Sequence, residues 1–263
     1  MVVDPCVDCS NISICKSLKR HRRVAIKAVF RYTKRMRIPL TRYGLPQVAV
    51  FPLLVLALMI ALFIVLRPNW YLIPIEIVLF LVLCWMFSFF RDPARNIQLN
   101  EKILYSPADG TITDITAVDD SALGPGALRI GMFLSVFNVH INRAPCAVRI
   151  EKVSYNKGKF INAMSSEATK INESNDVIMV RQEQPKDRLL VRQISGAIAR
   201  HIVCKAGEGA EYRQGEPFGM IKFGSRTELY LPASAPDEGK YEIAVKIGDK
   251  VRAGLTPFVR YLK

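Results

Sequence analysis

Two long apolar runs limit what this chain can fold into more strongly than any other feature. Residues 48–66 carry no charge, and residues 70–90 carry only Glu76. At about 1.5 Å of rise per residue, each run makes a helix long enough to cross a hydrocarbon core about 30 Å thick. The alternative is a pair of buried core helices, but two such runs are hard to bury in a chain of 263 residues. The sequence therefore predicts a transmembrane hairpin over residues 47–90.

Basic residues are concentrated ahead of this hairpin. Residues 1–90 contain twelve Lys and Arg against three Asp and Glu, and eleven of the basic residues lie between positions 16 and 42. The positive-inside rule places both ends of the hairpin in the cytoplasm, which predicts a cell-membrane protein with residues 91–263 on the cytoplasmic side. Residues 1–46 are expected to form a basic cytoplasmic segment that binds anionic lipid. A nucleic-acid arm is the alternative use of such charge, but the neighbouring hairpin favours lipid, and no nucleic-acid partner is expected.

Three cysteines near the start of the chain raise the question of a metal. Cys6, Cys9 and Cys15, with His21 beyond them, form a set of three thiolates and one imidazole that resembles a zinc ligand set. The cluster stands alone beside a basic tail. Incidental thiols are therefore the favoured interpretation, and no metal is expected.

Beyond residue 90 the sequence changes to short apolar stretches separated by Gly, Pro, Asn and Asp. This pattern is typical of strands and hairpins, and long amphipathic helices are not evident. Residues 91–263 are therefore expected to form one mainly β (α+β) domain. Its final part, with Gly248-Asp249 before a short strand pattern, is similar to the tight hairpins of lipoyl- and biotinyl-type domains. Residues 153–176 are polar and rich in Gly, Ser and Asn, which predicts a functional loop.

Three polar positions stand out in this apolar background. Gly224-Ser225 interrupts the strand pattern of "IKFGSRTELYLP", Asp109 lies in "SPADG", and His140 lies in "SVFNVHINRAP". Each has a plain structural explanation: a bulge or tight turn for Gly224-Ser225, turn chemistry for Asp109, and a packed histidine for His140.

Together, these residues have the chemistry of a nucleophile and its activating groups. A serine needs a base to become a nucleophile, and a carboxylate can hold that base in the right tautomer. The chain order Asp109, His140, Ser225 fits such a triad. The "GxSxG" elbow of α/β-hydrolases is missing around Ser225, which argues against that class.

Five motifs in order give the chain a family resemblance. "FFRDPARNI", "YSPADGTI", "FLSVFNVHINRAP", "NES" and "FGSRTELYLP" occur in the order found in phosphatidylserine decarboxylases, from about Phe89 to the end of the chain. The short bacterial type with "FGSR" is the most similar. Archaetidylserine decarboxylases look similar as well and remain an alternative.

The resemblance implies that the enzyme makes its own cofactor. In this family the serine attacks the carbonyl of the preceding glycine, and elimination followed by hydrolysis leaves a pyruvoyl group at a new N-terminus. Here the products would be a β chain of residues 1–224 and an α chain of residues 225–263, which carries a pyruvoyl group derived from Ser225. That group would form an imine with the amine of phosphatidylserine and withdraw electrons as carbon dioxide leaves, which yields phosphatidylethanolamine.

The same resemblance assigns the neighbouring residues. Asp109 and His140 would assist Ser225 during self-cleavage, and His140 would also transfer a proton in decarboxylation. Many family members carry a second histidine three residues further on, where this chain has Arg143. We therefore hypothesise that Arg143 binds the carboxylate or phosphate of the substrate, with an ordinary surface arginine as the alternative.

Two other functions compete with this interpretation. One is a pyruvoyl-dependent decarboxylase that acts on a soluble amino acid, for which the membrane hairpin would have no purpose. The other is a membrane-anchored, lipid-binding β module without enzymatic activity, in which Gly224-Ser225 is only a bulge. The sequence leaves open whether the chain forms a homo-oligomer.

The charge pattern makes a prediction about topology. A reporter that is active only in the cytoplasm should work when it is fused after Lys263, and a reporter that requires export should not. The same two reporters inserted in the turn at residues 67–69 provide the control, because their activities should be reversed there. Activity of the export-dependent reporter at the C-terminal fusion would contradict the orientation.

Overall fold

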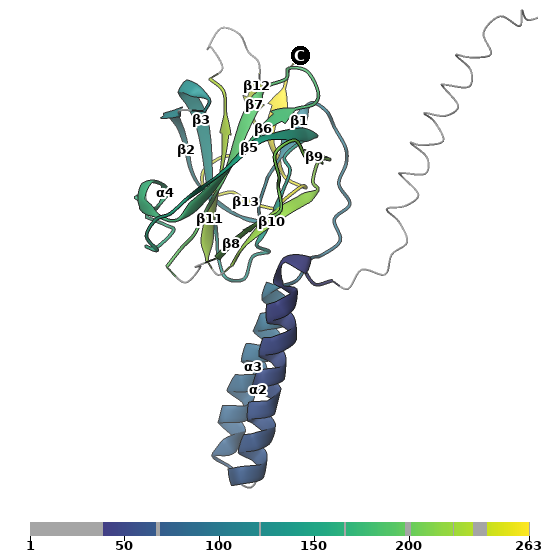
Figure 1. The fold of residues 1–263 in the computed structure, drawn as a ribbon, viewed down its shortest axis with the longest axis vertical. Coiled ribbons are helices and arrows are strands. Elements are labelled where there is room, and N and C mark those ends of the chain that lie inside the picture. The colour runs from purple at the N-terminus through teal and green to yellow at the C-terminus, as the bar shows by residue number, and fades with distance from the viewer. Residues whose placement is uncertain are drawn as a thin grey trace, which may run out of the picture. The chain divides into compact units, whose positions relative to one another are not determined.

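The computed structural model describes most of the chain beyond residue 38 (Figure 1). The described residues are 39–66, 69–120, 122–165, 167–197, 201–222, 224–233 and 241–262. All of them belong to the second of two compact units, residues 39–263; the first unit is residues 1–38. Cys6, Cys9, Cys15 and His21 lie outside the described residues, as does most of the predicted basic segment.

The two apolar runs form two helices that lie side by side (Figure 1). A short 3-10 helix, η1 (Arg42–Gly44), leads into α2 (Leu45–Leu66), and α3 (Leu72–Phe89) follows. Both long helices are long and apolar enough to cross a membrane. Their apolar side chains remain largely exposed, with Leu53 at 66% and Ile64 at 68%. Core helices of a soluble domain would bury such side chains, so a hydrophobic surrounding is needed to cover them.

The rest of the described chain is mainly β, as predicted, with one short helix, α4 (Ala168–Ile171). The strands pair into three sheets whose pairs are all antiparallel. The large sheet has the order β13 (Lys250–Val251), β2 (Gly110–Asp120), β3 (Gly124–Leu134), β11 (Ser225–Leu231), β7 (Arg188–Ile194), β6 (Ser174–Arg181), β5 (Val148–Asn156), β9 (Glu211–Tyr212). The two small sheets have the orders β1 (Ile103–Tyr105), β14 (Pro257–Tyr261), β12 (Tyr241–Ile243) and β4 (Ile141–Arg143), β10 (Pro217–Lys222), β8 (His201–Cys204).

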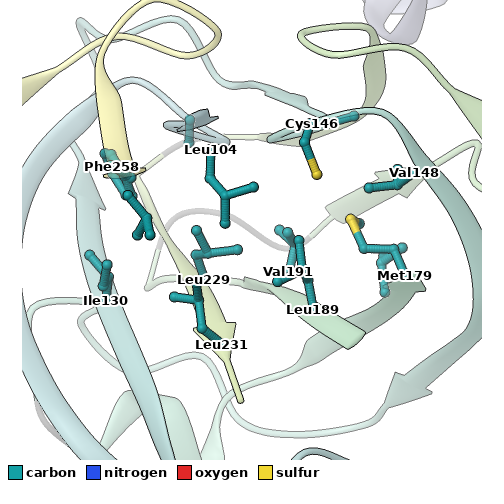
Figure 2. Packing of buried hydrophobic residues seen from close by; sticks show 14 of the residues in the cluster. Leu104, Ile130, Cys146, Val148, Met179, Leu189, Val191, Leu229, Leu231 and Phe258 are labelled. Carbon is teal, nitrogen blue, oxygen red and sulfur yellow. The ribbon is translucent and has the colours of Figure 1, made fainter. Parts of the chain in front are cut away.

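The main hydrophobic core joins the large sheet to strands β1 and β14 (Figure 2). Ile130, Val191 and Leu229 come from three neighbouring strands of the large sheet, and Leu104 and Phe258 come from β1 and β14. All five side chains are fully buried. Leu229 therefore ties the middle of the large sheet, strand β11, to the centre of the core.

A second, smaller core fastens the end of α3 to the β domain. Phe89 and Phe90 pack against Met220 of β10, with Trp85 and Val203 at the edge of the cluster. The Tyr43 hydroxyl also donates a hydrogen bond of 3.0 Å to the backbone oxygen of Pro217, where β10 begins. The apolar hairpin is thus attached to the sheet that contains β10.

The expected loop at residues 153–176 is shorter than predicted. Residues 153–156 continue β5 and residues 174–176 begin β6, and the two strands pair with each other. Polar residues occupy strand positions here because cross-strand pairing outweighs their weak strand propensity. At the other end of the domain, Gly248 has φ +92° and the Asp249 side chain accepts a hydrogen bond from the Lys246 backbone, so a tight turn lies where Gly248-Asp249 predicted one.

Candidate active site

The chain passes from one sheet into another at Gly224. Strand β10 ends at Lys222 in a small sheet, and β11 begins at Ser225 in the large sheet. Gly224 has φ +65°, a left-handed conformation that is strained for any residue with a Cβ. The break that the sequence places at Gly224-Ser225 is therefore a crossing between two sheets.

Ser225 is the first residue of β11 and lies opposite Leu134 of β3. Its side chain is fully buried, and its Oγ has no hydrogen-bond partner among the described residues. A buried hydroxyl without a partner costs about 1–3 kcal/mol, so such groups are rare and call for an explanation. This isolation makes Ser225 the candidate nucleophile of the site.

His140 lies directly before β4, and its buried imidazole contacts the residue that precedes Ser225. The Gly224 backbone N–H donates a hydrogen bond of 3.3 Å to Nε2, and Nδ1 lies 3.0 Å from the backbone oxygen of Asn138. A donor at Nε2 and an acceptor at Nδ1 assign the proton to Nδ1. The lone pair of Nε2 therefore points towards the backbone at Gly224.

The surroundings of His140 keep its imidazole neutral. Its pKa is lowered to about 4, mainly by burial; the hydrogen bond to Asn138 opposes this shift in part, and the nearby charge of Arg91 adds to it. The Phe89 ring lies against the imidazole with 4.5 Å between ring centroids, so α3 helps to exclude water. At neutral pH the imidazole is therefore able to accept a proton.

Asp109 lies between β1 and β2, and its carboxylate is engaged elsewhere. Arg95 donates a hydrogen bond of 2.8 Å to Oδ2, and the Ala253 backbone N–H donates one of 2.7 Å to Oδ1. Among the hydrogen bonds of the described residues, none joins Asp109 to His140 or Ser225. The structure thus brings His140, Gly224 and Ser225 together. Asp109 instead forms its hydrogen bonds with Arg95 and with Ala253 of the C-terminal segment.

Arg143 is the last residue of β4 and is buried. Its Nη2 donates a hydrogen bond of 2.6 Å to Asp92, and its Nη1 donates one of 3.1 Å to the backbone oxygen of Gly215. Asp92 follows closely after α3. Both contacts hold parts of the protein together, so the guanidinium fork faces protein groups in this structure.

Gly196 is a site residue that no sequence pattern marked. A Cβ at this position would lie 2.1 Å from the backbone oxygen of Gly224 and 3.2 Å from its carbonyl carbon. Only glycine allows this segment to approach the carbonyl that precedes Ser225 so closely. Because the two glycines are far apart in the chain, no local sequence signal could have found the contact.

Arg226, the residue after Ser225, is a second residue near the site that was not predicted from the sequence. It lies on the opposite face of β11, where it donates hydrogen bonds to Glu228 (2.6 Å), Thr113 (2.8 Å) and Asp114. Burial alone would raise the pKa of Asp114, but the hydrogen bond and charge of Arg226 lower it, which keeps the carboxylate ionised. Charges at alternate positions of an otherwise apolar strand were the available signal for this buried network.

Comparisons with known proteins agree on one family. A family model described as phosphatidylserine decarboxylase matches residues 83–258, which include Asp109, His140, Arg143, Gly224 and Ser225. A protein of Rhodopirellula baltica named phosphatidylserine decarboxylase proenzyme is 42% identical over 224 residues, which is 85% of this chain and 89% of that protein. A protein of the same name from Magnetococcus marinus is 39% identical over 73% of this chain and 84% of that protein. Another, from Syntrophus aciditrophicus, is 37% identical over 83% of this chain and 95% of that protein.

The buried imidazole predicts a pH dependence of stability. The pKa of His140 is about 4 in the folded chain, below its ordinary value of 6.5, so the unfolded chain binds more protons between these values. This contribution to stability is therefore complete above about pH 6.5 and is lost as the pH falls towards 4, by roughly 3 kcal/mol in all. Thermal unfolding of the detergent-solubilised protein from pH 7.5 to 4.5 should show a shallower decline for His140→Gln than for wild type.

His201 offers a matched control for that measurement, because it is exposed on β8. His201→Gln should follow the wild-type curve. Equal slopes for wild type and His140→Gln would show that burial of His140 does not shape the pH dependence.

Proposed function

The chain belongs to the phosphatidylserine decarboxylase family, and on that basis we propose how its own residues perform the reaction. It converts phosphatidylserine to phosphatidylethanolamine in phospholipid biosynthesis and is made as a proenzyme. Membership of this family argues against a β module without enzymatic activity. The family alone does not specify the bond that is cut in this chain, the side chains that act on it or the route of the lipid.

The bond that is cut is the one between Gly224 and Ser225. The observation that carries this proposal is the fully buried Ser225 Oγ, which has no hydrogen-bond partner among the described residues and is held next to a glycine in the left-handed conformation. Attack of Oγ on the Gly224 carbonyl carbon breaks the peptide bond and forms an ester. Elimination then releases the Gly224 carboxylate and leaves dehydroalanine, and addition of water expels ammonia and leaves a pyruvoyl group at position 225.

His140 is the base in this first stage. Its neutral imidazole takes the proton of the Ser225 hydroxyl as Oγ attacks and returns it to the departing backbone nitrogen. The hydrogen bond between the Gly224 N–H and Nε2 supports this role, because it holds the basic nitrogen at the dipeptide that reacts. The close approach of Gly196 supports it too, because it fixes the carbonyl that Oγ must reach.

The pyruvoyl group supplies the electron sink that decarboxylation of an amino acid requires. The buried end of β11 suits this group, because Ser225 is shielded from water that would compete with the substrate amine. We propose that His140 also transfers the proton that replaces the departing carbon dioxide. Phe89 against its ring keeps the site dry for that step.

Asp109 and Arg143 have supporting roles in this proposal. The contacts of Asp109 with Arg95 and Ala253 favour indirect assistance to Ser225, through the packing of the C-terminal segment. Substrate binding by Arg143 stays a prediction. Its bonds to Asp92 and Gly215 favour a role in positioning β4, which follows His140 directly.

The cut chain should remain one folded unit. Strand β11 pairs with β3 and β7, β13 pairs with β2, and β14 pairs with β1, so the α chain contributes strands to two sheets. Its 39 residues, 225–263, are too few to fold alone. These pairings support an α chain that stays docked on residues 1–224.

The lipid substrate gives the apolar helices a purpose. A diacyl lipid stays in the bilayer, so an enzyme tethered at the headgroup plane meets it there. We propose that residues 47–90 span the membrane, that residues 91–263 form the cytoplasmic catalytic domain, and that residues 1–46 bind anionic lipid. The exposed apolar side chains of α2 and α3 support the first point, and the charge distribution supports the other two. The similarity to lipoyl-type hairpins and a homo-oligomeric state stay predictions.

Replacing the nucleophile gives the first test. Purified wild type should contain two chains, residues 1–224 and a fragment of residues 226–263 capped by a pyruvoyl group, as measured by intact mass. Ser225→Ala should remain one chain and be inactive, because no hydroxyl is left to attack Gly224. Ser154→Ala on β5, three strands away from β11, should be processed like wild type. An uncut wild-type protein with full activity would refute the proposal.

Gly196 provides a test of the geometry. In Gly196→Ala the new methyl group would meet the Gly224 oxygen at 2.1 Å, so the carbonyl must move away from the position that Oγ attacks. We expect processing to slow by about 100-fold or more, because a displacement of about 1 Å can cost that much. The rate is measured from the appearance of the short chain on denaturing gels.

Gly207→Ala is the matched control for that change. A Cβ there meets nothing within 4 Å, so processing should keep its wild-type rate. If Gly196→Ala were processed as fast as Gly207→Ala, the contact with Gly224 would have no part in the cleavage.

A further inference from the structure

Lys222 lies close to the reactive dipeptide but has no role in the reaction proposed above. It is the last residue of β10 and lies two positions before Gly224. The residue is only 5% exposed, but its ammonium nitrogen reaches solvent, and among the described residues none forms a hydrogen bond or an ion pair with it. Burial lowers its pKa, and no neighbouring carboxylate offsets that effect.

The other buried cations of the described chain all have acceptors. Arg143 has Asp92, Arg226 has Asp114 and Glu228, and Arg181 has two backbone oxygens. The Lys222 ammonium differs from these groups, because its stem is buried while its nitrogen keeps contact with solvent and has no acceptor among the described residues. Lys222 is therefore a cation that is free to bind an anionic ligand close to the reactive dipeptide.

The position of Lys222 indicates where that anion comes from. Side chains two apart on a strand share a face, so Lys222 lies on the same face of β10 as Met220. Met220 packs against Phe89 and Phe90 at the end of α3, and β8 runs beside β10 at this end of the domain (Figure 1). Lys222 thus lies between the apolar hairpin and the residue that reacts, on the side where a membrane lipid would enter.

Phosphatidylserine carries two anionic groups, and they differ in what binding would do to the reaction. The carboxylate loses its charge as carbon dioxide leaves, so a cation bound to it would stabilise the ground state more than the transition state. The phosphodiester keeps its charge throughout, so a cation there improves binding without raising the barrier. Lysine is also a common phosphate ligand, because its ammonium acts as a compact point charge.

The short distance between Lys222 and residue 225 also favours the phosphodiester as the bound group. The Cα atoms of residues 222 and 225 are at most about 11 Å apart, because three residues span no more than about 3.6 Å each. In the substrate, only the serine carbons and one ester oxygen separate the phosphorus from the amine. A phosphate on Lys222 would therefore place the amine close to residue 225.

We propose that Lys222 binds the phosphodiester of the lipid substrate and so positions its amine at residue 225. This assignment rests on the proposed function, in which residue 225 carries the reactive carbonyl. It makes Lys222 a substrate-binding residue with no part in self-cleavage or in proton transfer.

The test is kinetic and uses the matured enzyme with dihexanoylphosphatidylserine. Lys222→Met should raise KM about 10- to 100-fold, as expected for the loss of a charged hydrogen bond, and change kcat by less than about threefold. Lys222→Arg should keep KM within a few-fold of wild type. Lys205→Met, which removes an exposed lysine one residue after β8, should behave as wild type.

Free serine separates a failure of this inference from a failure of the function. Serine lacks the phosphodiester, so borohydride should trap it on Lys222→Met as fast as on wild type. Slower trapping on the variant, or a wild-type KM for the lipid, would overturn the role of Lys222. A wild-type protein that neither cuts itself nor traps serine would instead refute the proposed function.

A measurement on wild type does not depend on how any variant folds. Acetylation of Lys222 is followed by peptide mass in the presence of dihexanoylphosphatidylcholine, which has a phosphodiester but neither a carboxylate nor a primary amine. It should slow acetylation at least about fivefold, whereas dihexanoylglycerol, with the same chains and no phosphate, should not. Equal effects of the two lipids, or equal protection by inorganic phosphate at the same concentration, would overturn the assignment to the lipid.

Discussion

The position of strand β11 inside the large sheet is the constraint on which the rest of the structure depends. The strand pairs with β3 on one side and β7 on the other, so neither edge is free. Leu229 points into the core, and Arg226 and Glu228 form a charged network on the opposite face. A register shift of one residue would turn Arg226 and Glu228 into the hydrophobic core and Leu229 towards the charged network. Ser225, the first residue of the strand, is therefore held in one place.

The turn into β11 brings together the groups of the candidate active site. Gly224 adopts a left-handed conformation, Gly196 lies against its carbonyl, and the Ser225 hydroxyl is buried without a described partner. The unpartnered hydroxyl costs free energy that the surrounding sheets must offset. His140 adds a neutral imidazole to this turn, and it stays neutral because it is buried.

The apolar hairpin and the reactive turn are parts of one packed unit. Phe89, at the end of α3, contacts the imidazole of His140 and also packs with Met220 of β10. The same strand β10 carries Lys222 and leads into Gly224. In the function proposed above, a lipid that approaches along the hairpin would meet the apolar cluster, then Lys222, then residue 225. The packing of α3 against His140 thus connects the apolar hairpin to the candidate active site.

The sequence by itself determined the features that local patterns encode. Long uncharged runs predicted the two helices, short apolar stretches predicted the β domain, and a Gly-Ser step inside a strand pattern marked the crossing between two sheets. The tertiary structure decided the contacts between distant segments: Arg95 and Ala253 as partners of Asp109, the approach of Gly196, and the isolation of Lys222. Periodicity and turn residues act over a few positions, so they are readable in sequence. Which distant side chains meet depends on strand register and packing, which only the folded chain specifies.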